Sequence, residues 1–235
     1  DTSPDLIGTI SQVFQDKTGG DESLKLRMEA LDYLLVHAKG DELYSVIFEI
    51  ITGYSDKIMR VGILERLGSV DDSRTVALAT QLFARSETHP PNPPNLLSYV
   101  VRMFVNNLRH VEPQTYRDFV NNFLRYESEV WDKEDVSGID ELLNRINVQL
   151  SVEANDEREK ERAAVSIDAL VQIINNSKFP RGTRDKAAKM LALHLPKGTM
   201  FNSPYIQALY NSFYSEPKIT SKSKSDLMES LWLSF

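Results

Sequence analysis

Apolar residues recur at intervals of three and four along most of this chain, and this spacing places side chains on one face of an α-helix. In the first third, such stripes cover residues 22–39, the segment after Asp41, the segment before Gly68 and the segment after Asp71. Asp or Ser before a stripe and Gly after it are residues that satisfy the unpaired backbone groups at helix ends. The pattern predicts consecutive helices joined by short turns, with Asp41 as an N-cap, and no segment favours a strand.

The second half of the chain continues this pattern. Apolar spacing predicts helices over residues 139–150, 183–195 and 204–215. The polar stretch 155–162 either protrudes or begins the helix that carries Val165. We therefore expect an all-α fold of about ten to twelve helices.

The predicted core consists of large apolar residues from these stripes. They are Leu31, Leu35, Ile47, Ile63, Leu64, Leu82, Phe104, Phe119, Leu143 and Leu191.

A repeated phrase lies in mid-chain. The pattern Arg-x-Phe-Val-Asn-Asn occurs at residues 102–107 and again at residues 117–122, with Pro113 between the copies. Proline fits the first turn of a helix, where its missing N–H costs nothing. The two copies therefore predict two helices joined by a tight turn, as an antiparallel helical hairpin.

Pairs of apolar residues also recur at a longer interval of about 33 residues, which is the length of two helices and two short turns. Leu31 and Leu34 recur as Leu64 and Leu67, and the pair Leu97 and Val100 follows at the same spacing. In apolar spacing more than in residue identity, this pattern resembles the helical repeats of the HEAT and armadillo class. The resemblance implies antiparallel helical hairpins stacked as an α-solenoid. The alternative is a compact multi-helix bundle around a cavity.

A proline-rich stretch interrupts the predicted array at residues 88–95. Its prolines favour extended backbone that a helix does not cross. We predict N-terminal helical hairpins in residues 1–87, a loop at 88–95 and a C-terminal helical region at 96–235. We expect the two helical regions to pack as one continuous array.

Composition narrows the classes of partner and location. The formal net charge of −7 argues against a general affinity for nucleic acid, because polyanions favour a basic surface. The longest dense apolar stretch, residues 44–51, is too short for a transmembrane helix. The polar start at Asp1 leaves two locations open, the cytoplasm and secretion after removal of a signal peptide, and we expect no integral membrane protein.

The repeated phrase supplies the candidate partner-binding residues. In armadillo-like arrays, asparagines on successive inner helices bond to an extended peptide, because a carboxamide both donates and accepts hydrogen bonds. The alternative is capping of helix C-termini. The candidates are Asn106, Asn107, Asn121, Asn122, Arg102 and Arg117.

Charge is separated into two blocks in the second half. Residues 127–161 hold twelve acidic and four basic residues, whereas residues 178–197 hold six basic residues and one acidic residue. The basic block suggests a site for phosphate groups, and its alternative is charge complementarity with the acidic block. The candidate anion-binding residues are Arg181, Arg184, Lys186 and Lys189.

Signatures of catalysis are lacking in the sequence. The four histidines are widely separated, cysteine is absent, and there is no Gly-x-Ser-x-Gly elbow and no glycine-rich phosphate loop. We expect no enzyme, no metal and no cofactor. The expected function is a non-enzymatic interaction protein that binds another protein through a curved helical surface. The alternative is a carrier of a lipid or other hydrophobic ligand in a helix-lined cavity, and an enzyme with an unrecognised site is the third class.

Overall fold

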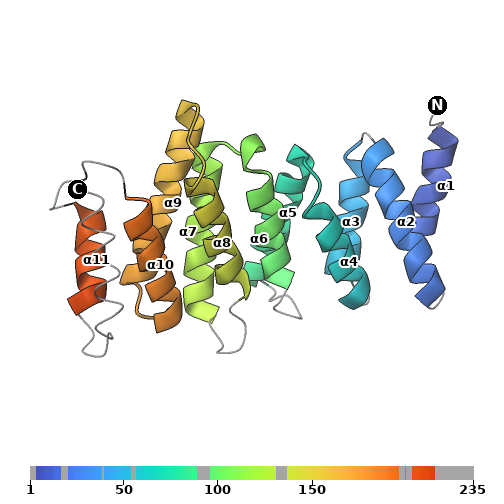
Figure 1. Ribbon diagram of the computed structural model, residues 1–235. Helices are drawn as coiled ribbons and strands as arrows, with labels where there is room; N and C mark the ends of the chain where they lie inside the picture. Colours follow the sequence, from blue (N-terminus) through green and yellow to red (C-terminus); the bar gives the residue numbers. More distant parts are fainter. Residues whose placement is uncertain are drawn as a thin grey trace. The chain divides into compact units, whose positions relative to one another are not determined.

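The computed structural model describes residues 4–16, 21–38, 40–53, 57–88, 96–130, 137–195, 199 and 203–214. Within these ranges all regular structure is helical, with eleven α-helices and a short 3-10 helix, η1 (Figure 1). The predictions of an all-α fold and of the number of helices are confirmed for this part of the chain. The helices are α1 (Pro4–Gln15), α2 (Asp21–His37), α3 (Glu42–Thr52), α4 (Lys57–Leu67), α5 (Ser73–Thr88), α6 (Leu96–Asn106), η1 (Leu108–His110), α7 (Pro113–Val130), α8 (Ser137–Leu150), α9 (Glu157–Asn175), α10 (Arg181–Leu193) and α11 (Pro204–Tyr214).

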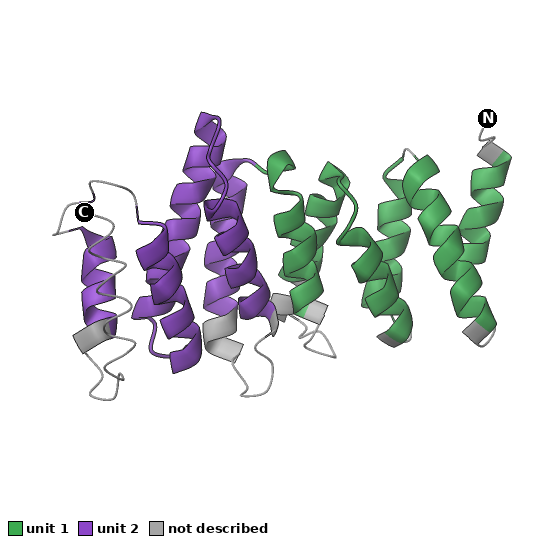
Figure 2. Ribbon diagram, in the orientation of Figure 1, with its two compact units in different colours: residues 1–111 green, residues 112–235 purple. Residues whose placement is uncertain are grey.

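The chain divides into two compact units, residues 1–111 and residues 112–235 (Figure 2). The division falls between Val111 and Glu112, whereas we expected an interruption at 88–95, of which residues 89–95 lie outside the described ranges. α6 belongs to the first unit, where it packs on α5 and α4. The two copies of the repeated phrase therefore lie in different units, one on α6 and the other on α7.

In the first unit, helices adjacent in sequence pack in pairs, α1 with α2, α3 with α4 and α5 with α6. The pairs also contact one another, because α2 packs on α4, α4 on α6 and α3 on α5. In the second unit α9 is central, since α7, α8, α10 and α11 all pack on it. Amphipathic helices bury their apolar face, and few large hydrophobic side chains of the described residues are exposed.

Large apolar side chains fill the interior of each unit. Nine of the ten predicted core residues are buried, and the exception is Leu35, which is partly exposed while Leu34 beside it is 1% exposed. The three pairs at the 33-residue interval are all buried, on α2, α4 and α6. The interval thus marks interior positions of the first unit.

Several helix ends follow from single residues. Asp41 occupies the N-cap position of α3, as predicted, but its side chain makes no capping hydrogen bond. Asp156 is a true cap, because its carboxylate accepts from the backbone N–H of Glu159 at 2.8 Å. Glu159 in turn accepts from the N–H of Asn155, and the polar stretch therefore begins α9.

Candidate interaction surface

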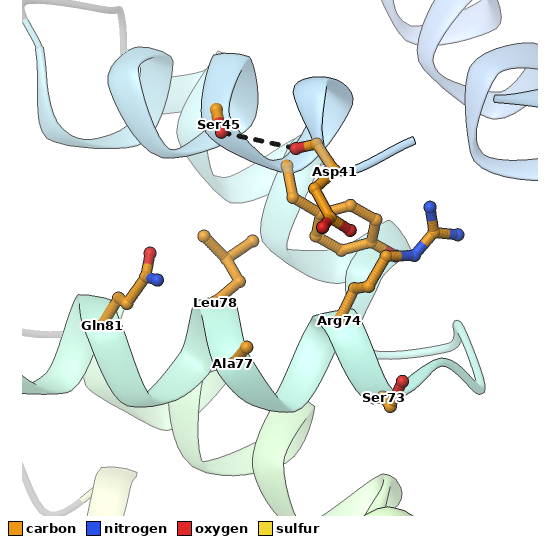
Figure 3. A pocket seen from close by; sticks show the side chains of 8 residues that line it. Asp41, Ser45, Ser73, Arg74, Ala77, Leu78 and Gln81 are labelled. Atoms are coloured by element: carbon orange, nitrogen blue, oxygen red, sulfur yellow. Dashed lines mark hydrogen bonds between the residues drawn. The ribbon is translucent and has the colours of Figure 1, made fainter. Parts of the chain in front are cut away.

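Two hollows flank the first turns of α3 in the first unit. The α3–α5 hollow, of about 330 Å³, is lined by Asp41, Tyr44, Ser45, Ser73, Arg74, Ala77, Leu78 and Gln81. In Figure 3, Gln81, Leu78 and Arg74 point from α5 toward Ser45 and Asp41. Hydroxyl, amide and carboxylate groups therefore surround a small apolar floor.

The α1–α3 hollow is larger, about 480 Å³, and it is more apolar. Its polar lining residues are Ser11, Gln15 and Glu42. The others are Ile7, Gly8, Leu34, Ala38, Gly40, Leu43 and Val46. Leu34 and Leu43 are buried, whereas Ile7 and Val46 are partly exposed, so apolar surface lies open at this place.

Arg74 holds the α3–α5 hollow in shape. Its guanidinium forms a bidentate pair with the carboxylate of Asp72, at 2.6 to 3.1 Å, and donates to the carbonyl oxygen of Gly40 at 3.0 Å. Its Cζ lies 4.9 Å from the centre of the Tyr44 ring. Because these contacts engage all three guanidinium nitrogens and pair the positive charge with Asp72, Arg74 acts as a structural clamp rather than as a site for an anion.

The protonation of this cluster follows from its contacts. The hydrogen bond from Arg74 holds the pKa of Asp72 below its ordinary value. Burial raises the pKa of the Tyr44 hydroxyl, which lies 3.3 Å from the hydroxyl of Thr75. At neutral pH the cluster therefore consists of a carboxylate, a guanidinium and neutral hydroxyls, without a group suited to take up a proton.

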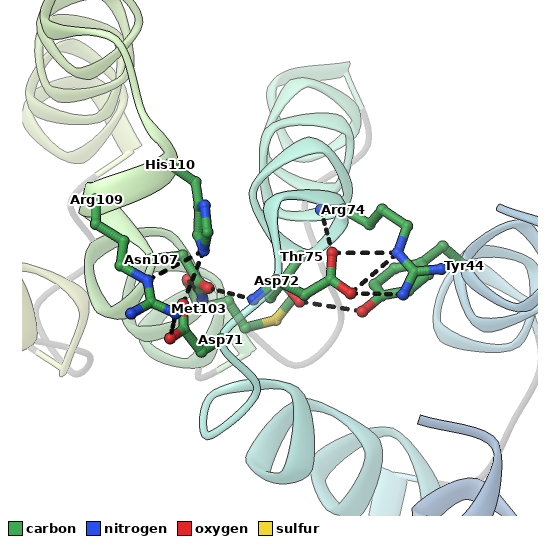
Figure 4. Close-up of polar contacts among 9 residues, drawn as sticks. All are labelled: Tyr44, Asp71, Asp72, Arg74, Thr75, Met103, Asn107, Arg109 and His110. Atoms are coloured by element: carbon green, nitrogen blue, oxygen red, sulfur yellow. Dashed lines mark hydrogen bonds and ion pairs between the residues drawn. The ribbon is translucent and has the colours of Figure 1, made fainter. Parts of the chain in front are cut away.

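Asn107 connects this cluster to the end of α6, as Figure 4 shows. The side chain is fully buried, its oxygen accepts from the backbone N–H of Asp72 at 2.9 Å, and its nitrogen donates to the carbonyl oxygen of Met103 at 2.9 Å. The carboxamide therefore caps a helix end and fixes the turn before α5. Capping, the alternative to peptide binding, is the role that this geometry gives to Asn107.

The neighbouring candidates are also engaged within the first unit. Asn106 donates to the carbonyl oxygen of Gly68, and the guanidinium of Arg102 lies 5.6 Å from the centre of the Tyr99 ring. The carboxylate of Asp71 pairs with Arg109 and lies 2.8 Å from Nε2 of His110, from which it accepts a hydrogen bond when that nitrogen carries the proton. These contacts tie the end of α6 and η1 to the turn that precedes α5.

In the second unit the second copy of the phrase faces α9. Asn121 accepts from the amide of Gln172 at 2.9 Å, and Arg117 lies 3.5 Å from the carboxylate of Asp168. Asn122 is exposed. The structure thus places the six candidates in two groups, each within its own unit.

Three of the four candidate anion-binding residues make polar contacts within the second unit. Lys186 bonds to Asp140 and Asn144 on α8, both at 3.0 Å, and Arg181 lies 3.6 Å from Asp185. Arg184 donates to the carbonyl oxygen of Phe179 at 3.2 Å. Lys189 is exposed. Complementarity with the acidic block, the alternative to an anion site, accounts for Lys186.

The second unit contains a buried polar cluster that the sequence patterns did not predict. The hydroxyl of Tyr116 lies 2.9 Å from that of Ser166, and Gln149 accepts from Ser166 at 2.9 Å. Burial raises the pKa of Tyr116 to about 12, so the phenol stays neutral. Tyr116 and Ser166 are fully buried, so the cluster links α7, α8 and α9 from inside rather than facing a ligand.

Two further findings concern the part of the chain that the structure describes. No group of three or more His, Asp or Glu side chains is placed there to hold a metal ion. None of its helices combines the length and apolar composition that crossing a bilayer requires.

Comparison with known proteins assigns no class. No family model matches the chain, and neither a curated protein nor a solved structure shows significant similarity to it.

Proposed function

We propose that this protein is a non-enzymatic interaction protein, whose helical hairpins stack as an α-solenoid and bind another protein. The packing order of the first unit supports the stack. Hairpins α1–α2, α3–α4 and α5–α6 contact one another through equivalent helices. In a stack of repeats each repeat contacts only its neighbours.

Polar contacts in the first unit follow the same rule. Asp32 pairs with Arg66 at 2.6 Å, and Glu65 accepts from Tyr99 at 3.5 Å. Gly40 accepts from Arg74 at 3.0 Å. Partners in all three contacts are 34 residues apart, close to the predicted interval of about 33, and this shared spacing carries the proposal. Further polar contacts between segments of the first unit join residues 31 to 39 positions apart.

The candidate surfaces for a partner are those whose polar groups are accessible. In the first unit the main candidate is the pair of hollows beside α3. They replace Asn107, because that side chain is fully buried. In the second unit, Arg117, Asn121 and Asn122 remain candidates because all three are exposed. Lys189 also remains a candidate, because it is exposed.

The second candidate function is a carrier of a hydrophobic ligand. The α1–α3 hollow favours it, because a volume of about 480 Å³ and an apolar lining suit a small molecule. We rank it second because this lining includes partly exposed residues, whereas a carrier encloses its ligand.

Small-angle X-ray scattering tests the stack. A compact protein of 235 residues has a radius of gyration of about 17 to 18 Å. We expect a clearly larger radius, because stacked hairpins extend in one direction. A radius in the compact range would contradict the solenoid.

Native mass spectrometry separates the two functions. One portion of the purified protein is sprayed from a non-denaturing buffer, and a second portion is extracted with organic solvent. We expect only the mass of the polypeptide, since an interaction protein has no resident ligand. A retained lipid or small molecule would instead support the carrier.

A further inference from the structure

A glycine in α1 has no explanation in the packing of the chain. Gly8 lies inside a twelve-residue helix, where glycine is less stable than alanine. A Cβ built on Gly8 would meet nothing within 4 Å. Gly62 in α4 differs, because a Cβ there would lie 3.1 Å from the sulfur of Met28.

Gly8 lines the α1–α3 hollow, and a side chain added at Gly8 would have open space around its Cβ. Glycine on a helix surface permits another backbone to approach closely. Ile7 and Val46, both partly exposed, supply apolar surface, and Ser11 and Gln15, hydrogen-bonded to each other at 3.1 Å, supply a hydroxyl and an amide. Such a mixture suits a peptide segment, whose backbone bonds to polar side chains while one of its side chains enters an apolar space.

The negative charge beside the α1–α3 hollow favours a peptide segment that carries a positive charge. Glu42 lines the α1–α3 hollow, and Asp41, the preceding residue, lines the α3–α5 hollow; both are exposed. Arg74, the cation that lines the α3–α5 hollow, is already bonded to Asp72 and Gly40. The start of α3 therefore presents negative charge that a cationic side chain would complement.

We propose that the α1–α3 hollow binds a segment of a partner protein in which an apolar side chain stands beside a Lys or Arg. The apolar side chain enters against Ile7 and Val46, the segment's backbone passes over Gly8, and its cation faces Glu42. This inference rests on the proposed interaction function and specifies its partner.

Panning a phage-displayed library of random peptides against the full chain tests the inference. We expect enriched peptides to share an apolar residue next to Lys or Arg. The affinity of a synthetic copy of the most enriched peptide is then measured by fluorescence anisotropy against variants of the protein.

Gly8→Leu is the decisive variant, because a Cβ at this position meets nothing within 4 Å and the leucine side chain would take up space at the hollow. We expect it to weaken binding by about tenfold or more, since the peptide loses its apolar contact. Glu42→Gln should weaken binding less and reduce its dependence on salt. Gly182→Leu on α10 is the matched control, because a Cβ there also meets nothing within 4 Å, and it should leave binding unchanged.

Other outcomes overturn the inference. Enriched peptides that bind Gly8→Leu as well as the natural chain would place the interaction elsewhere, and the proposed interaction function would stand. A library that yields no enriched peptide would refute the peptide site, while scattering still decides the stack independently. Loss of a retained small molecule in Gly8→Leu would assign the hollow to a ligand, and conversion of a dimer to a monomer in sedimentation would assign it to a second copy.

Discussion

At the residue scale, one guanidinium joins three parts of the first unit. Arg74 at the start of α5 contacts Asp72 in the preceding turn, Gly40 before α3 and the ring of Tyr44 on α3. Lysine cannot make the bidentate contact or stack as a plane. We expect Arg74→Lys to lower the free energy of unfolding by about 1 to 3 kcal/mol, measured by urea denaturation. An unchanged midpoint would show that the clamp adds nothing to stability.

The lowered pKa of Asp72 predicts a dependence of stability on pH. Because the folded-state pKa lies below the unfolded value of about 3.9, the contribution of Asp72 is present above that pH and is lost as the pH falls through the folded-state pKa. Asp72→Asn should therefore flatten the acid side of the curve of unfolding free energy against pH. Arg74→Met, which removes the hydrogen bond, should flatten it similarly. A steep acid limb retained in both variants would contradict this assignment.

Leu35 on α2 and Leu64 on α4 were both predicted to be core residues, but they differ in burial. Leu64 is 0% exposed, and Leu64→Ala should cost about 2 to 5 kcal/mol, because it removes contacts and leaves a cavity. Leu35 is partly exposed, so Leu35→Ala should cost clearly less. Chemical denaturation of both variants makes the comparison, and equal losses would contradict the burial found here.

At the scale of elements, the start of α9 depends on its cap. Asp156→Ala should cost about 1 kcal/mol, because the N–H of Glu159 loses its acceptor. Asp41→Ala is the control, since Asp41 stands at the N-cap of α3 without a capping bond and should cost less. Thermal unfolding followed by circular dichroism measures both. A larger loss for Asp41 would reverse the assignment.

The Asp156 cap also predicts where proteolysis begins. Residues 157–161 form the first turn of α9, whereas 151–156 form a turn and an irregular stretch before it. Limited digestion should therefore cut at 151–156 before it cuts within 157–161, because a protease needs extended backbone. Early cleavage inside 157–161 would show that the first turn of α9 is not stably formed.

At the scale of the whole molecule, a stack of hairpins predicts that a destabilising substitution affects only the helices that neighbour it. Leu64 lies on α4, which packs on α2 and α6. Hydrogen exchange should rise in α2, α4 and α6 of Leu64→Ala and should change little in α9, because interactions in such arrays connect neighbours. An equal rise in α9 would indicate a single cooperative bundle.

Most of the helices and most of the core could be predicted from the sequence because they depend on local spacing, whereas exact helix bounds differ by a residue or two. A face of a helix is set by residues three and four positions apart, and capping acts within one turn. Leu31, Leu64 and Leu97 illustrate this, since the sequence alone placed each on an apolar stripe and each is buried.

The tertiary structure decided what residues distant in sequence do together. Asn107 is a cap rather than a peptide ligand because Asp72, 35 residues earlier, lies beside it, and Lys186 is paired because Asp140 on α8 lies 3.0 Å away. The hollow beside Gly8 likewise exists only because α1, α2 and α3 come together there. Periodicity specifies which face of a helix is buried but carries no information about which side chains from other helices meet that face, and only packing determines those contacts.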